Sequence, residues 1–481
     1  MRGIVSCFSL LFLMLTTSQV TLAKEEPTLD APRLCRRDLP SAINKILNRP
    51  ELRRSHWGIE IQTLESSRTL YSLNGEQFFT PASSLKLLTS AAGLLTLGAD
   101  YQIKTSVYGV GEWQNLTSLR LQGQGDPTIS TKSLKDIVHQ LQAQGIKRIE
   151  TLIIDDSYFA PPLINPTWEW LDVHSYFATA VNSTILNQNT VTLTLFPQEI
   201  GQPVKFIWSD AIAGKQWQVI NQAITGQADL EYNLELDGYL GQPKLQLRGE
   251  LAVNQPTDVW DLAVLNPAQY FLESWRVELD NAGIRVNQAI VVNQPQENQL
   301  ERELITIDSP PLQQILKEIN QDSNNLYAEV LGKILAKKSR QETTTDAIEL
   351  SLKTIGIKPT EYVLVDASGL SRQNLITPQT LVNTLRIMSQ LPEGESYQKS
   401  LAVAGISGTL KRRFLNTSVA GNLWGKTGTL TGVGTLSGYI IDQKNPSLVF
   451  SILVDNSELK SKTIRQVIDE IIVITNQHNQ C

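Results

Sequence analysis

Apolar and polar positions follow different periods along this chain, and the change of period predicts where its elements lie. Near the start, apolar residues recur at helical spacing over 39–47 and then alternate with polar ones over 56–64 and 67–73. Two alternating stretches separated by a few polar residues predict a β-hairpin. The run rich in Leu and Ala that follows Ser83 predicts a buried helix.

From about residue 101 the pattern changes to short alternating segments broken by Asn, Gln, Gly and Pro, which is typical of strands and turns. Helical spacing interrupts them at 131–144 and 267–282. We therefore expect a β-rich region of about 200 residues with its own core, folded as one or two subdomains. The strand-like segments are YQIKTSVYGV, LTSLRLQG, RIETLIID, NTVTLTLFP, PVKFIWS, LEYNLEL and KLQLRGELAV.

After residue 301 helical spacing returns, and the chain closes with two strand-like segments, GVGTLSGYIIDQ and SLVFSILVDN, before a final amphipathic helix. The predicted helices are 311–321, 324–339, 344–356, 377–390 and 458–475. A hairpin and helix at the start, and strands and a helix at the end, thus bracket the β-rich region. We expect a discontinuous α/β domain built from residues 24–99 and 303–481, with residues 100–302 inserted.

Composition adds the class of protein. The 481 residues are 41% apolar and 19% charged, with a formal net charge of -6, as in a soluble protein of more than one domain. An acidic chain has no overall positive charge to attract nucleic acid, so we expect no such partner. Residues 1–23 have the form of a secretory signal peptide, which predicts export. The alternative is a retained amphipathic anchor, and no later segment is long enough to span a membrane.

Two cysteines remain after such a cleavage, Cys35 and Cys481, at opposite ends of the mature chain. An exported protein can form a disulfide, and a domain built from both termini would bring these residues together. Such a bond would contribute roughly 4–5 kcal/mol through loop entropy. The alternative is two unpaired thiols.

The candidate chemistry starts with Ser83 and Lys86. Their spacing of three residues puts both side chains on one face of the predicted helix. A lysine in a buried helix is costly unless it has a partner or a task. The Ser-x-x-Lys spacing also occurs at residues 396–399 and 457–460, but those segments are polar. Only the Ser83 pair precedes an apolar helix.

Two further motifs follow along the chain. Ser323-Asn324-Asn325 stands at the head of a predicted helix, where an N-cap is the alternative explanation. The only Lys-Thr-Gly, at residues 426–428, leads a strand-like stretch whose glycines allow a ligand to approach the backbone. The alternative there is a glycine-rich edge strand. The spacing of a phosphate-binding loop is absent, and we expect no metal or cofactor.

Taken together and in this order, the three motifs make the chain resemble the penicillin-recognising serine enzymes. The long insert and the stretches QGQGDPTIS, IIDDSYF and VDASGLSRQNLITP resemble the D-alanyl-D-alanine carboxypeptidase/endopeptidase family of low-molecular-mass penicillin-binding proteins. The likeness spans nearly the whole mature chain and is weakest around residues 160–265. It implies a serine β-lactamase/transpeptidase-like fold of the α/β (α+β) class.

The resemblance also implies roles for named residues. Ser83 would be the nucleophile and Lys86 its base, since burial and a second cation, Lys426, both favour a neutral lysine. Ser323 would pass a proton to the leaving amine. Asn325 would hydrogen-bond the amide side chain of the substrate. None of His56, His139, His174 and His478 has the sequence setting of a serine–histidine triad.

The remaining roles concern substrate binding. Thr427 and Thr429, on either side of Gly428, would hold the terminal carboxylate, and the N–H groups of Ser83 and Thr429 would form the oxyanion hole. Asp155 and Arg372 match family positions that hold the free amino-and-carboxyl end of the peptide. The alternatives are a turn residue for Asp155 and a surface ion pair for Arg372.

The implied substrates are peptidoglycan stem peptides ending in D-Ala-D-Ala, and plausibly D-Ala–diaminopimelate cross-bridges, with β-lactams as inhibitors. The expected location is the periplasm or cell-wall space. Two other functions stay open at this point. A serine β-lactamase would deacylate quickly, although the large insert disfavours it. A non-catalytic wall-binding protein could keep the fold, although the intact set of motifs disfavours that too. The oligomeric state is open.

Overall fold

The computed structural model describes residues 35–295, 299–442 and 445–477. The predicted signal peptide lies outside these ranges. Cys35 is disulfide-bonded, but its predicted partner Cys481 also lies outside them, so that pairing stays a prediction. Within the described ranges, none of the helices combines the length and the apolar character needed to cross a bilayer.

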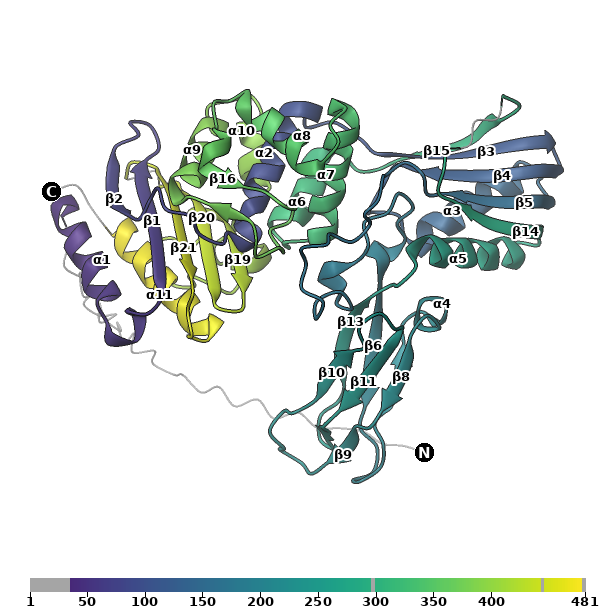
Figure 1. The fold of residues 1–481 in the computed structure, drawn as a ribbon, viewed down its shortest axis with the longest axis horizontal. Helices are drawn as coiled ribbons and strands as arrows, with labels where there is room; N and C mark the ends of the chain where they lie inside the picture. Colours follow the sequence, from purple (N-terminus) through teal and green to yellow (C-terminus); the bar gives the residue numbers. More distant parts are fainter. Residues whose placement is uncertain (1–34, 296–298, 443–444, 478–481) are drawn as a thin grey trace, which may run out of the picture.

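The main body is built around a six-stranded sheet to which both ends of the chain contribute (Figure 1). Its strands, in spatial order, are β18 (Ala402–Val403), β19 (Leu423–Leu430), β20 (Val433–Ile440), β21 (Leu448–Asp455), β1 (His56–Thr63) and β2 (Thr69–Leu73). The predicted hairpin is β1–β2. Strand β1 also pairs antiparallel with β21, with Trp57 opposite Val454. This pairing joins the first and last parts of the chain in one sheet.

Helices cover both faces of this sheet (Figure 1). Helices α1 (Leu39–Leu47) and α11 (Ser461–Asn476) pack on one face, and their apolar sides form a core with Ile59 and Phe450. The other face is covered by a larger helical layer whose core includes Leu88 and Leu331. The helices of this layer are α2 (Lys86–Leu97), α6 (Leu312–Asn320), α7 (Asn325–Ser339), α8 (Thr344–Lys353), α9 (Pro378–Met388) and α10 (Gly394–Lys399).

The insert leaves the body after α2 and returns at α6. It holds a five-stranded sheet of β14 (Arg285–Val292), β5 (Arg148–Asp155), β4 (Asn115–Gly123), β3 (Lys104–Glu112) and β15 (Arg302–Asp308). Helices α3 (Thr131–Ala143) and α5 (Pro267–Asn281) lie beside this sheet (Figure 1), and apolar residues of the sheet and both helices share a separate core. Strand β15 extends the insert's sheet past the predicted limit at residue 302.

A lower lobe of short strands completes the insert (Figure 1). It contains β6 (Thr190–Phe196), β7 (Lys205–Trp208), α4 (Ala211–Gly214), β8 (Gln218–Asn221), β9 (Ile224–Gly226), β10 (Glu235–Gly238), β11 (Lys244–Arg248), β12 (Glu250–Ala252) and β13 (Asp258–Ala263). The many short strands fit the alternating pattern of the sequence, in which polar turn residues recur every few positions.

A loop of the insert packs against the body and ties the two parts together. Trp168 and Val181 from this loop belong to the same apolar core as the helical layer. The indole N–H of Trp168 donates to Asp366 Oδ2 over 3.0 Å, and Asn165 Nδ2 donates to the carbonyl oxygen of Val365 over 2.7 Å. The 365–366 segment leads into a loop of the body, connecting β16 (Tyr362–Val363) with β17 (Leu375–Ile376), that lines the candidate site.

Candidate active site

Ser83 lies in a tight 3₁₀ turn, Ala82–Leu85, from which α2 continues at Lys86. Lys86 Nζ is 2.9 Å from Ser83 Oγ. Ala82 has φ +45°, a region that a residue with a Cβ occupies only under strain and that is common beside reactive groups. Gly369 makes room for this turn, because a Cβ at Gly369 would be 1.9 Å from the Ala82 carbonyl oxygen.

Lys86 is fully buried and has two further acceptors. Its Nζ donates to Asn325 Oδ1 over 2.6 Å and to the carbonyl oxygen of Ser368 over 2.7 Å. Burial lowers the pKa of Lys86 to about 7, although the charges of Asp366 and Glu329 act in the opposite direction. Lys86 is therefore a group that can hold or accept a proton near neutral pH.

A second lysine faces a second serine on the opposite wall. Lys426 Nζ in β19 is 2.8 Å from Ser323 Oγ, just before α7, and also donates to the carbonyl oxygen of Thr427. Ser323 has φ +62°, so a second predicted site residue lies on or beside a left-handed backbone. Lys426 is fully buried, and burial together with the charge of Lys86 lowers its pKa well below the ordinary value.

Strand β19 runs directly past Ser83. A Cβ at Gly428 would be 2.9 Å from the Ser83 backbone nitrogen and 2.3 Å from Thr435 Oγ1, so only glycine permits this approach. Thr427 Oγ1 donates to Thr409 Oγ1 over 2.8 Å, and the next threonine, Thr429, is exposed. The strand edge can therefore offer N–H and hydroxyl groups to a ligand at Ser83.

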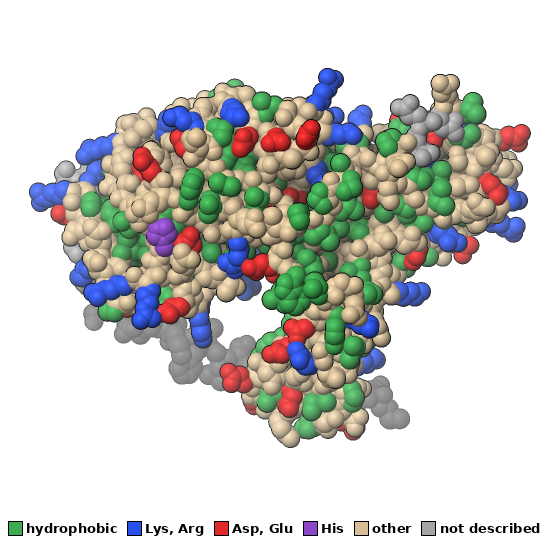
Figure 2. Space-filling view, in the orientation of Figure 1, with side chains coloured by type: hydrophobic (Ala, Val, Ile, Leu, Met, Phe, Trp, Pro, Cys, Tyr) green, Lys and Arg blue, Asp and Glu red, His purple; other side chains and the backbone are tan. Residues whose placement is uncertain are grey.

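These walls enclose a cleft of about 750 Å³ between body and insert. Figure 2 shows this face of the molecule hollowed where the lower lobe meets the body, with hydrophobic side chains gathered over the junction. The predicted site residues that line the cleft are Ser83, Ser323, Asn325, Arg372, Thr427 and Thr429. Lys86 and Lys426 lie beneath them, each bonded to one of these serines.

Arg372 lines the cleft, but the acidic residues near it are not the predicted one. Its Nε lies 3.0 Å from Glu169 Oε1, and its Nη1 donates to the carbonyl oxygen of Thr431 over 3.0 Å. Asp172 lines the same cleft; burial and Glu169 raise its pKa, whereas the charge of Arg372 lowers it. Arg372 and the two acidic residues, Glu169 and Asp172, thus form a cluster of opposite charges in the lining of the cleft.

Asp155 lies elsewhere. It ends strand β5 in the insert's sheet, is fully buried, and is absent from the lining of the cleft. Its Oδ2 accepts from Arg120 Nη1 over 2.6 Å and its Oδ1 accepts from the Ser157 N–H over 3.1 Å. This geometry supports the alternative of a structural residue at a strand end, and gives the proposed peptide-binding role no support.

Sequence reasoning missed several residues of the site. Glu329 and Asp366 are buried carboxylates whose charges favour the protonated form of Lys86. A lone glutamate among apolar residues in NLYAEVLG was the available signal for Glu329. Glu169 and Asp172 fall in the stretch where the resemblance is weakest, and no motif marks them.

Comparison with known proteins bears on this geometry. A family model described as D-Ala-D-Ala carboxypeptidase 3 (S13) matches residues 39–475. The chain belongs to this carboxypeptidase family. The resemblance to this family that the sequence motifs indicated is thus confirmed, and the protein is a serine peptidase of the D-Ala-D-Ala carboxypeptidase type. The matched residues include the body, the whole insert and nearly all of helix α11.

Two curated relatives of this S13 carboxypeptidase are similar over most of their length. A penicillin-sensitive carboxypeptidase A from Dictyostelium discoideum is 27% identical, covering 97% of this chain and 96% of the relative. A D-alanyl-D-alanine carboxypeptidase from Actinomadura sp. (strain R39) is 29% identical, covering 90% of this chain and 84% of the relative.

Solved structures confirm the predicted fold class. The crystal structure of penicillin binding protein 4 from Haemophilus influenzae has a TM-score of 0.80 and 24% identity, covering 91% of this chain and 99% of that one. A predatory peptidoglycan endopeptidase, Bd3459 from Bdellovibrio bacteriovorus, has a TM-score of 0.51 and 16% identity, covering 89% of this chain and 94% of that one. At these identities the likeness concerns the fold.

Proposed function

We propose that this S13 carboxypeptidase hydrolyses the terminal D-Ala-D-Ala bond of peptidoglycan stem peptides through an acyl-enzyme on Ser83. The observation that carries the proposal is the pair of lysine–serine contacts across one cleft, Lys86 with Ser83 and Lys426 with Ser323. A serine needs a base to become a nucleophile, and a buried lysine with a pKa near 7 supplies one.

In the acylation step, Ser83 Oγ attacks the carbonyl carbon of the penultimate D-Ala, and its proton passes to Lys86 Nζ. The carbonyl oxygen becomes an oxyanion, which the N–H groups of Ser83 and Thr429 stabilise. Such preorganised donors are worth roughly 3 kcal/mol each in the transition state. The close approach of Gly428 to the Ser83 amide supports this assignment.

The peptide C–N bond then breaks, and Ser323 passes a proton to the departing D-Ala amine beside Lys426. Ser323 regains a proton from Lys426 Nζ, to which it is hydrogen-bonded. Water then attacks the ester and its proton returns to Lys426 through Ser323. The ester C–O bond breaks, Ser83 Oγ takes back its proton from Lys86, and the product leaves with a free carboxyl group.

Thr427 and Thr429, with the charge of Lys426, hold the terminal carboxylate. Asn325 hydrogen-bonds the amide side chain of the substrate, and its bond to Lys86 couples that contact to the base.

The same chemistry extends to D-Ala–diaminopimelate cross-bridges, because the leaving amine can belong to a second peptide. Bd3459, which has the same fold, is described as a peptidoglycan endopeptidase, and this supports the extension. Arg372, with Glu169 and Asp172 close by, suits a leaving group that carries both an amino and a carboxyl group. The substrate implies export to the periplasm or cell-wall space, and β-lactams would acylate Ser83 as substrate mimics.

Incubation with purified muropeptides tests the proposal. Mass spectrometry should detect free D-Ala from pentapeptides and monomers from cross-linked dimers. Absence of both products, from a protein that folds, would contradict it. Labelling with fluorescent penicillin in parallel separates the alternatives: a long-lived adduct is expected, rapid turnover of a chromogenic cephalosporin would favour a β-lactamase, and no reaction with either reagent would favour a non-catalytic protein.

A further inference from the structure

Glu329 has no role in the steps above, yet it is a buried carboxyl group that two backbone N–H groups hold in place. It lies in α7, one helical turn after Asn325, and is 6% exposed. Its Oε1 accepts from the N–H of Ala367 over 3.0 Å and from the N–H of Ser368 over 2.9 Å. A buried carboxyl group is costly unless such bonds compensate it.

Ser368 connects Glu329 to the catalytic base. Its N–H binds the carboxyl group, and its carbonyl oxygen accepts from Lys86 Nζ over 2.7 Å. The position of that carbonyl therefore depends on Glu329 on one side and determines where Lys86 Nζ can lie on the other. Thr89 in α2 adds a bond to the carbonyl oxygen of Ala367 over 2.7 Å, so the 367–368 peptide group is held from two helices.

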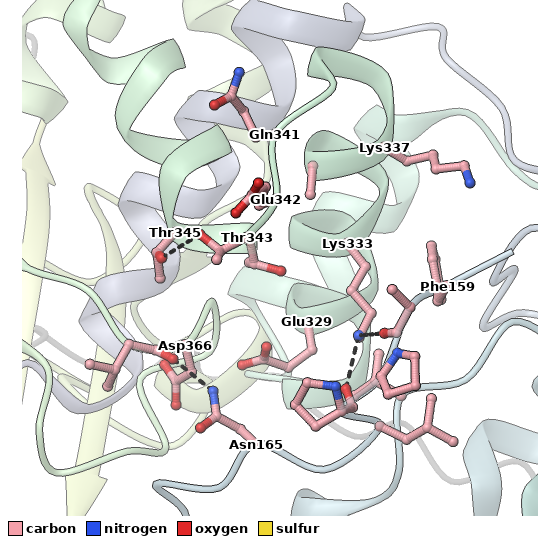
Figure 3. Close-up of a pocket in the computed structure, with 18 of the residues that line it drawn as sticks. Phe159, Asn165, Glu329, Lys333, Lys337, Gln341, Glu342, Thr343, Thr345 and Asp366 are labelled. Carbon is pink, nitrogen blue, oxygen red and sulfur yellow. Dashed lines mark hydrogen bonds between the residues drawn. The ribbon is translucent and has the colours of Figure 1, made fainter.

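Glu329 opens onto a cavity separate from the substrate cleft. This second cavity has a volume of about 410 Å³, and Glu329 and Asp366 line it, whereas neither lines the cleft at Ser83. Figure 3 draws Glu329 between Asp366 and Lys333, whose Nζ bonds the carbonyl oxygens of Ala160 and Pro162 instead of the glutamate.

The charged groups around Glu329 come from several elements. Asp366 comes from the loop between β16 and β17, Lys86 from α2 and Lys333 from α7 itself. Lys337 and Glu342 lie further out on the cavity wall.

Burial and the charge of Asp366 raise the pKa of Glu329 to about 8. The bonds of Glu329 to Ser368 and Ala367, and the charge of Lys86, act against this rise.

We propose that Glu329 is a positioning residue for Lys86, acting through Ser368, whose carbonyl group it holds at the distance that keeps the lysine opposite Ser83. The inference rests on the proposed function, because it assigns a support to the base of that reaction. When Glu329 is ionised, its charge also favours the protonated form of Lys86.

Three variants separate this role from simple packing. Glu329→Gln keeps an oxygen of the same reach for the two N–H groups and removes the charge. Glu329→Ala removes the acceptor. Glu342→Gln is the matched control, because this exposed carboxylate lines the same cavity and has no bond to the 367–368 peptide groups. For each, the acylation rate by penicillin is measured from pH 5 to 9, together with the melting temperature.

We expect Glu329→Ala to acylate roughly 10- to 100-fold more slowly at every pH, since misplacing a reacting group by about 1 Å can cost up to about 100-fold. Glu329→Gln should keep the wild-type acid limb and most of the rate at every pH. A pKa of about 8 leaves the Glu329 carboxyl group largely neutral where Lys86 titrates, and the amide oxygen of Gln can still accept from both N–H groups. Glu342→Gln should match the wild type.

An Ala variant with the wild-type rate, or a Gln variant as slow as the Ala variant, would overturn the inference. If the Ala variant does not fold, Glu329→Asp decides, because its carboxyl group is one methylene shorter. Acylation at least about 10-fold slower than that of the Gln variant supports the inference, and acylation equal to that of the Gln variant overturns it. Failure of the wild type to react with penicillin would instead count against the proposed function.

Discussion

Lys86 Nζ donates to Asn325 Oδ1 over 2.6 Å, although 239 positions of sequence separate the two residues. This bond joins the first and second motifs at the base of the cleft. Asn325 Nδ2 in turn donates to the carbonyl oxygen of Phe177, over 2.8 Å, in the insert. Lys86 is therefore oriented by the body and, through the side-chain amide of Asn325, by the insert as well.

The pH dependence of acylation should follow Lys86. A lysine is a base only when neutral, and burial lowers the pKa of this one to about 7. The acylation rate should therefore fall by roughly tenfold per pH unit below that value and level off above it. Stopped-flow or quenched labelling with penicillin measures it. A rate independent of pH between 5 and 9 would contradict the assignment of Lys86 as base.

Ser83→Ala should abolish penicillin labelling and leave the melting temperature close to that of the wild type, because Ser83 is only half-buried. Ser84→Ala is the matched control in the same turn. Its hydroxyl bonds Thr435 over 2.7 Å, so its loss should cost about 1 kcal/mol of stability and leave labelling intact. Mass spectrometry that found the adduct on a peptide lacking Ser83 would refute the nucleophile.

Gly428→Ala should reduce acylation by at least about 100-fold, the effect of losing one oxyanion donor. The new methyl group would meet Thr435 Oγ1 and the Ser83 amide and move β19 away from the nucleophile. Gly425→Ala is the control in the same strand, since its nearest neighbours are methyl groups of Leu436 and Leu423 at 3.1 and 3.2 Å, which can shift. Equal rates for the two variants would exclude this role for Gly428.

Asp155→Asn should lower stability, whereas Asp172→Asn should weaken substrate binding. Asp155 is bonded to Arg120 inside the insert, so its change should lower the free energy of unfolding by about 1 to 3 kcal/mol without altering KM. Asp172 lines the cleft near Arg372, so its change should raise KM for peptides with a free amino-and-carboxyl end. Chemical denaturation and peptide hydrolysis measure both. A raised KM for the Asp155 variant would restore its predicted role.

The local elements of the fold could be predicted because they depend on neighbours in sequence. The hairpin β1–β2, the helix after Ser83 and the closing helix α11 all follow from the period of their apolar positions. The sequence predicts only that both ends of the chain form one domain around the insert. The pairing of β1 with β21, and its register with Trp57 opposite Val454, cannot be read from either strand alone.

The sequence by itself determined the family and proposed the side chains that carry the chemistry, because the motifs around Ser83, Ser323 and Lys426 are short and local. Only the tertiary structure decided which groups surround them. Burial lowers the pKa of Lys86, the Ser368 carbonyl group meets its ammonium group, and Asp155 is turned into the insert. Burial and long-range contacts are properties of the packed chain, and no spacing along the sequence encodes them.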